Sequence, residues 1–117
     1  MGKVFIIKGH KVMLDIDLAE LYGDCVKYVR FISTLNKERF PDDFKFSLTA
    51  QEKVFIKSQS DRLEKLTLRD AYTEVGALAL ASQLRSDRAI NINIQYIKDL
   101  FDSKTISLFG SNSLFFK

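Results

Sequence analysis

The sequence has little of several residue types on which particular classes of site depend. It contains one cysteine, one histidine, one proline and no tryptophan among 117 residues. The lone Cys25 excludes an internal disulfide and fits a reducing, cytoplasmic compartment. One histidine and one cysteine cannot supply an ordinary zinc site, so we expect no metal. No apolar run approaches the roughly 18 residues that a membrane helix needs, so we expect no membrane partner.

The patterns that accompany catalysis are also missing. There is no glycine-rich phosphate loop, and the carboxylates are scattered over positions that helix capping explains. We therefore expect neither an active site nor a cofactor. The chain shows no repeat, low-complexity segment or internal linker. This favours a single domain over 1–117, with a body at 1–103 and an aromatic tail or hairpin at 104–117.

What the sequence does contain is typical of a small globular domain. Hydrophobic residues make up 46% and charged residues 28% of the chain, and ten phenylalanines supply an aromatic core. The formal net charge is +3. A mildly basic balance permits a nucleic-acid partner without requiring one.

Short apolar runs predict β-structure at both ends and in the middle. Residues 4–7 and 12–14 flank a turn containing Gly9, which predicts a hairpin. Residues 44–48 alternate apolar and polar side chains after Pro41, which predicts a half-buried strand. A second alternating run at 66–68 is a candidate partner for it.

The segment 15–34 has the pattern of two helices joined by a glycine turn. The first helix is expected to start at Asp15 or Asp17, and Asp17 with Glu20 resembles a capping box. Gly23 is placed to end this helix in a left-handed conformation. Asp24 can cap the second helix. The spacing of Ala19, Gly23 and the apolar residues that follow is typical of a helix-turn-helix.

The second of these helices is predicted to be amphipathic. Its inward stripe is Cys25, Val29, Ile32 and Leu35, and its outward face is basic. Further elements follow from capping residues and periodicity: a helix at 50–58 capped by Thr49, a loop at 58–64, a central helix at 73–85 capped by Thr73, and a helix from about 86 with Ile90, Ile94, Ile97 and Phe101 inward. The expected class is therefore α+β, a helix-turn-helix-like core flanked by short β-hairpins.

Three motifs follow one another along this chain. They are Asp17-Leu18-Ala19-Glu20-Leu21-Tyr22-Gly23, then Arg39-Phe40-Pro41 with Asp43-Phe44, then Thr73-Glu74 and Gly76 with Leu84-Arg85-Ser86. Together they resemble the phage and viral KilA-N and Bro-N related DNA-binding domains, in particular the subgroup named for the N-terminal domain of phage open reading frame six. The resemblance covers about 13–101. It implies DNA binding, often in the front half of a phage antirepressor or regulator.

The chain departs from that family where phosphates are expected to be met. Thr34, Leu35 and Asn36 stand where the family tends to carry a basic run. The family's glycine- and arginine-rich loop is replaced around 58–65, and no C-terminal effector domain follows the match. These departures leave open whether the DNA-contacting face is retained.

The resemblance and the basic second helix together predict double-stranded DNA as the partner of a non-enzymatic regulator. Lysine and arginine neutralise phosphates and can reach guanine edges. The candidate DNA-binding residues are Lys27, Tyr28, Arg30, Phe31, Lys37, Arg39 and Lys45. In the alternative interpretation these basic side chains form an ordinary solvated face. Either way, we expect the protein in the host-cell cytoplasm, and at the nucleoid if it binds DNA.

The aromatic tail offers a second hypothesis. Its apolar residues can pack on the core, mediate a homodimer or bind a host or phage protein. They are Leu108, Phe109, Leu114, Phe115 and Phe116. With the thinned basic run, they favour an antirepressor or anti-defence inhibitor that acts by protein–protein binding.

Overall fold

Five strands form one sheet in the order β3-β4-β2-β1-β5. The computed structural model describes residues 3–84, 87–91, 94–102 and 105–107. The strands are β1 (Val4–Ile7), β2 (His10–Leu14), β3 (Lys45–Ser47), β4 (Asp70–Tyr72) and β5 (Thr105–Ser107). The helices are α1 (Asp15–Tyr22), α2 (Val26–Leu35), η1 (Lys37–Arg39), α3 (Ala50–Ser58), α4 (Asp61–Glu64), α5 (Glu74–Leu84), α6 (Asp87–Asn91) and α7 (Ile94–Asp102).

The α+β class is confirmed, but its β-structure is one sheet and not two hairpins flanking a helical core. Neighbouring strands are antiparallel except β5, which runs parallel to β1. Among the described strands, β1 and β2 form a hairpin. β3 and β4 pair antiparallel although α3 and α4 lie between them in sequence. The pairing predicted for 44–48 is therefore correct in kind, but its partner strand begins at Asp70, later than the predicted 66–68.

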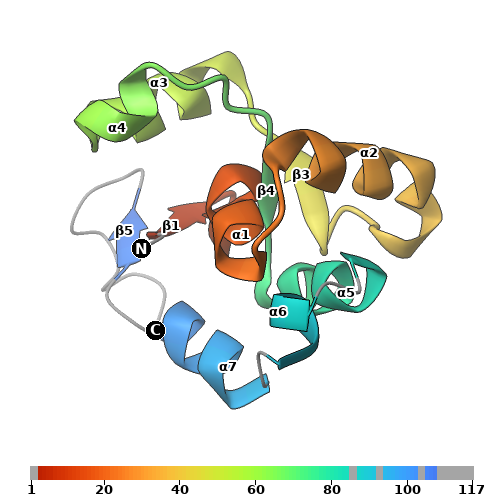
Figure 1. Cartoon of the computed structure of the whole chain (residues 1–117). Helices are drawn as coiled ribbons and strands as arrows, with labels where there is room; N and C mark the ends of the chain where they lie inside the picture. Colours follow the sequence, from red (N-terminus) through yellow and green to blue (C-terminus); the bar gives the residue numbers. More distant parts are fainter. Residues whose placement is uncertain (1–2, 85–86, 92–93, 103–104, 108–117) are drawn as a thin grey trace.

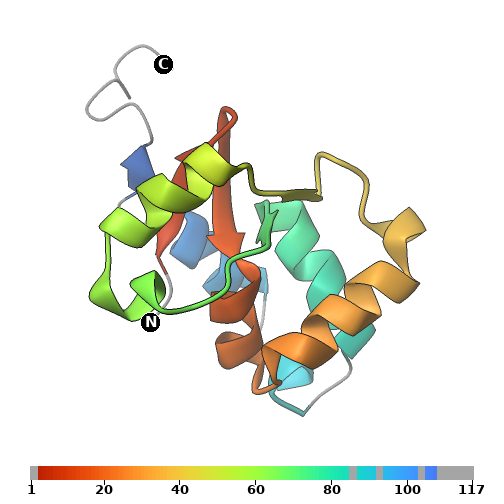
Figure 2. The same ribbon diagram turned by 90° about the horizontal axis from the view of Figure 1, so that it is seen from above.

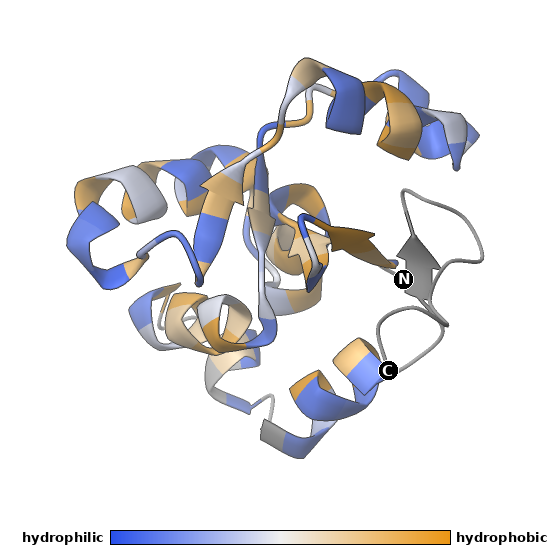
Figure 3. Ribbon diagram, turned by 180° about the vertical axis from the view of Figure 1, so that it is seen from behind, coloured by the Kyte–Doolittle hydropathy of each residue, from blue (hydrophilic) through white to orange (hydrophobic). Residues whose placement is uncertain are grey.

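Helices cover both faces of the sheet because successive strand residues point to opposite sides. Val4, Met13 and Tyr72 belong to one buried cluster, together with residues of α1, α2, α5, α6 and α7. Phe5 and Ala71 belong to the other, together with residues of α3 and α4. Figure 1 shows α3 and α4 apart from the remaining helices, and Figure 3 shows the hydrophobic character of β1.

The β1–β2 turn follows the sequence prediction. Lys8 and Gly9 both have positive φ, 54° and 79°. Two such residues in succession are the pattern of a type I′ turn, whose twist matches that of the strands it joins. The predicted loop at 58–64, by contrast, contains α4, and its Leu63 is buried with the residues of α3. Packing of the apolar Leu63 against the core thus stabilises a short helix within a mainly polar segment.

The α1–turn–α2 unit forms as predicted, although its caps differ. Gly23 has a φ of 76° and its N–H donates to the Glu20 carbonyl at 3.2 Å. The helix begins at Asp15, so the predicted capping box at Asp17 is wrong, and the Asp17 carboxylate accepts from Arg62 at 2.6 Å. The predicted cap at Asp24 is also wrong, because α2 is preceded by Cys25 without a side-chain cap.

Two other caps are confirmed. Thr49 and Glu52 exchange both hydrogen bonds of a capping box at the start of α3. Thr73 accepts from the Gly76 N–H at 3.3 Å in the first turn of α5. The helix expected from about 86 corresponds to α6 and α7, with 92–93 outside the described residues. Ile97 and Phe101 are buried as expected, and the side chains of Ile90 and Ile94 lie outside the described part. The tail residues from Leu108 to Phe116 lie outside the described residues.

At Gly76, the backbone of α5 lies directly against the backbone of Phe44, in the turn that precedes β3. A β-carbon there would lie against the Phe44 carbonyl oxygen, well inside van der Waals contact. We expect Gly76→Ala to destabilise the domain by about 3 kcal/mol, because backbone must move on one side or the other. Gly9→Ala is the control: it has open space and only the strain of positive φ, about 1 kcal/mol. Urea unfolding measures both, and equal effects would contradict this account.

Candidate nucleic-acid interface

α2 lies at the edge of the domain, where it packs on α1 and α5 through one side (Figure 2). Val29 and Ser33 are buried there, and Val26 and Ile32 are partly buried against the core. The predicted inward stripe is thus right at Val29 and Ile32. It is wrong at Cys25, which is exposed, and at Leu35, which is 64% exposed. Ser33, a polar residue, takes the inward position one turn after Val29.

The outward side of α2 exposes three large apolar side chains. Tyr28 is 41%, Phe31 59% and Leu35 64% exposed. Their spacing of three and four residues places them on one helical face. Lys27 and Thr34 are exposed beside them. The outward face is therefore mixed and not uniformly basic.

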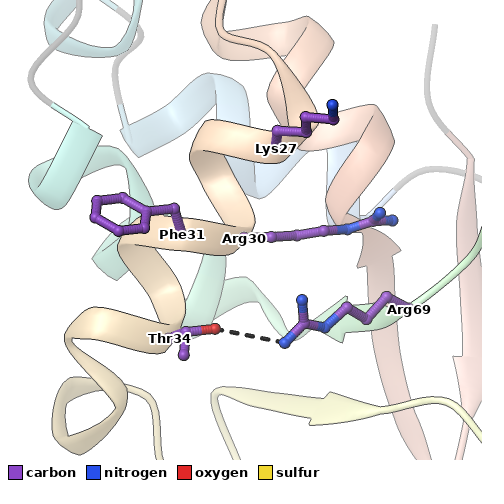
Figure 4. Close-up of a pocket in the computed structure, with 5 residues that line it drawn as sticks. All are labelled: Lys27, Arg30, Phe31, Thr34 and Arg69. Atoms are coloured by element: carbon purple, nitrogen blue, oxygen red, sulfur yellow. Dashed lines mark hydrogen bonds between the residues drawn. The ribbon is translucent and has the colours of Figure 1, made fainter.

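An open depression of about 410 Å³ lies along this helix. Figure 4 shows its lining: Lys27, Arg30, Phe31 and Thr34 from α2, and Arg69 from the segment before β4. The Arg69 guanidinium donates to the Thr34 hydroxyl at 3.4 Å and lies 3.6 Å from the Asp70 carboxylate. Half of the Arg69 side chain, 51%, is exposed, so it adds a cation to the rim of the depression.

Arg30 does not point into solvent as the sequence predicted. Its Nε donates to Oδ2 of Asp15 at 2.7 Å, and its Nη2 donates to Oδ1 of Asp15 at 3.2 Å. The same Nη2 donates to the Thr67 carbonyl at 2.8 Å. The side chains of Arg30 and Asp15 are 16% and 1% exposed. The structure therefore uses Arg30 to compensate a buried carboxylate.

Lys45 is likewise directed into the domain. Its Nζ donates to the Ser33 hydroxyl at 2.6 Å and lies 3.9 Å from the Asp70 carboxylate. Only 15% of the side chain is exposed. The prediction of a surface lysine beside the second helix is wrong here, because Asp70 is buried in β4 and needs a cation.

Lys37 and Arg39 are exposed in η1, directly after α2. These two side chains place positive charge beyond the end of α2, although the acidic Glu38 lies between them in sequence. Asp42, whose negative charge would oppose DNA binding, lines a separate depression with Lys8. Of the seven predicted residues, five are thus exposed along α2 and η1: Lys27, Tyr28, Phe31, Lys37 and Arg39.

Comparison with known families decides which group of proteins this domain belongs to. The ORF6N domain family matches residues 2–83. The chain belongs to the ORF6N domain family. This agrees with the resemblance found in the sequence and points to a phage-type regulatory domain. No curated protein and no solved structure is similar enough to this chain to count as a match.

The described part of this ORF6N domain has neither a membrane-spanning helix nor a cluster of metal-binding side chains. None of its helices there combines the length and the apolar character needed to cross a bilayer. No group of His, Cys, Asp and Glu side chains among those residues is arranged to hold a metal ion.

In this ORF6N domain, the contact between α1 and α2 includes a group that can titrate, the buried carboxyl of Asp15 paired with Arg30. Burial raises the pKa of the Asp15 carboxyl, and the hydrogen bond and charge of Arg30 oppose that rise. Arg30→Met leaves the carboxylate buried without its cation, so we expect a loss of about 3 kcal/mol at neutral pH. Lys27→Met, at an exposed position on the same helix, should change the free energy of unfolding by no more than about 0.5 kcal/mol.

The loss in Arg30→Met should depend on pH. Without Arg30 the folded-state pKa of Asp15 rises further above its ordinary value of 3.8. A raised carboxyl pKa means that stability is present at low pH and is lost as pH rises through the folded-state pKa. Urea unfolding should therefore show the deficit shrinking as the pH is lowered from neutrality. Adding Asp15→Asn removes the titrating group, and a pH dependence that persisted in this double variant would contradict the assignment.

Proposed function

We propose that this domain is a non-enzymatic DNA-binding regulator whose α2 docks in the major groove. The observation that carries the proposal is the exposed outward face of α2, which has Lys27 and Arg69 on the rim of its depression and no Asp or Glu in the helix itself. Family membership supports a regulatory role of phage type.

The shape of the α1–turn–α2 unit suits this docking. A helix of ten residues is about 15 Å long, and the major groove is about 12 Å wide. α2 buries its Val29 side against the domain, and Tyr28, Phe31 and Leu35 are exposed on the side that would face a duplex. α1 then lies behind α2, where a helix-turn-helix places its supporting helix.

The cations available to phosphates are fewer than the sequence suggested. Lys27 and Arg69 flank the depression, and Lys37 and Arg39 lie beyond the end of α2. Arg30 is engaged with Asp15 and is therefore a supporting residue in this proposal. Phosphate contacts of this number give modest, salt-dependent affinity.

Lys27→Gln tests the phosphate role of this face. Each phosphate contact contributes about 0.9 to the slope of log affinity against log salt concentration, so we expect the slope to fall by about one. Gel-shift titrations on duplex DNA over a salt series measure it.

Lys98→Gln is the matched control, because Lys98 is an exposed lysine on α7, away from α2. It should leave both affinity and slope unchanged. If the unaltered domain has no affinity for DNA even at low salt, the proposal fails.

A second candidate function is supported by the apolar side chains on the same face. Tyr28, Phe31 and Leu35 form a stripe of the kind that packs on another protein. An antirepressor or anti-defence inhibitor would use such a stripe, with or without the tail, to bind a host or phage protein.

Affinity capture from host lysate separates the two functions. A protein-binding inhibitor should retain one stoichiometric partner after nuclease treatment, and Leu35→Glu should release it, since a charge would enter an apolar interface. Truncation after Asp102 tests whether the tail contributes. Retention that depends on intact nucleic acid would favour the DNA-binding function instead.

A further inference from the structure

The outward face of α2 is short of the side chains that read base edges by hydrogen bonding. Major-groove readout pairs Arg or Lys with guanine, Asn or Gln with adenine, carboxylates with cytosine, and apolar groups with the thymine methyl. α2 contains no Asn, Gln, Asp or Glu. Its single arginine, Arg30, is held by Asp15. Asn36, just past the helix, donates its side-chain amide to the Ile32 carbonyl.

Phe31 lies at the centre of the exposed face of α2. It is 59% exposed, and Figure 4 shows its ring projecting from α2 in the direction opposite to Arg30. Helical spacing places Lys27 and Thr34 on one flank of Phe31, and Tyr28 and Leu35 on the other. A duplex that approached this face of α2 would therefore contact the apolar ring of Phe31 first, with the cation of Lys27 beside it.

We infer that Phe31, with Leu35 beside it, reads the 5-methyl group of thymine, so that the preferred ligand is thymine-containing duplex DNA. This rests on the proposed DNA-binding function and assigns its base preference. The thymine methyl is the apolar group that distinguishes one base in the major groove. Burying one methyl against the ring strengthens binding by about fourfold.

Duplexes that differ only in that methyl group provide the test. The probes are alternating dA–dT and alternating dA–dU duplexes of equal length, titrated with the full chain at one salt concentration. We expect the dA–dT duplex to bind at least about fourfold more tightly. Phe31→Ala should bind both duplexes equally.

A second pair of probes adds a methyl group instead of removing one. Alternating dG–dC duplexes are compared with the same duplexes carrying 5-methylcytosine, which places a methyl at the equivalent position of a different base pair. The unaltered chain should bind the methylated duplex more tightly, and Phe31→Ala should not. Lys27→Gln, which alters a cation and not the ring, should weaken binding to all four duplexes by a similar factor.

The outcomes separate the inference from the function beneath it. Equal affinity of the unaltered chain for the dA–dT and dA–dU duplexes would overturn the thymine assignment and leave DNA binding intact. The same holds if the preference for methyl groups persists in Phe31→Ala. No binding to any of the duplexes at low salt would overturn both, and capture of a nuclease-resistant protein partner through Phe31 would then assign the ring to that interface. The comparison within the unaltered chain needs no variant to fold.

Discussion

The placement of α2 depends on one buried ion pair. Asp15 follows β2 directly and opens α1, and its carboxylate takes two hydrogen bonds from Arg30 in the middle of α2. The same guanidinium holds the Thr67 carbonyl, in the segment that leads to β4. A buried pair of this kind adds little net stability compared with apolar packing, but losing one partner is costly. Its main consequence here is to orient α2, because the Arg30 guanidinium connects α2 both to Asp15 of α1 and to the Thr67 carbonyl before β4.

Other buried carboxylates of the domain are also paired with cations, so the net charge overstates how many basic side chains are available at the surface. The buried carboxylates Asp17 and Asp70 have cationic partners in Arg62 and Lys45. Burial without such partners would be expensive, so these cations belong to the fold. The formal charge of +3 counts them equally with the exposed cations. The number of basic side chains along a helix is therefore a poor measure of its DNA-contacting surface unless their partners are known.

Local signals in the sequence predicted several turns and caps, although not the caps of α1 and α2, and they could not reveal which distant side chains meet. The Lys8–Gly9 turn, the left-handed Gly23 and the Thr49 capping box depend on residues within one turn of each other. The pairing of Arg30 with Asp15 joins residues 15 positions apart, and the contact of Arg69 with Thr34 joins residues 35 apart. An arginine on a predicted outward face looks the same whether or not a buried carboxylate lies beside it, so periodicity could not find either contact.

In the proposed complex with DNA, affinity and base preference would be carried by different parts of α2. With Arg30 and Lys45 engaged inside the domain, Lys27, Lys37 and Arg39 remain near this face, together with Arg69, which is half exposed but shared with Asp70 at 3.6 Å. Three to four phosphate contacts would correspond to a salt slope of roughly −3 to −4. So few phosphate contacts would give weak sequence-independent binding, so base contacts would contribute a larger share of the binding free energy. Thr34 and Leu35 bring uncharged side chains next to Phe31. The scarcity of charge that would weaken the attraction to any duplex would thus leave an apolar surface by which the proposed complex could prefer one duplex to another.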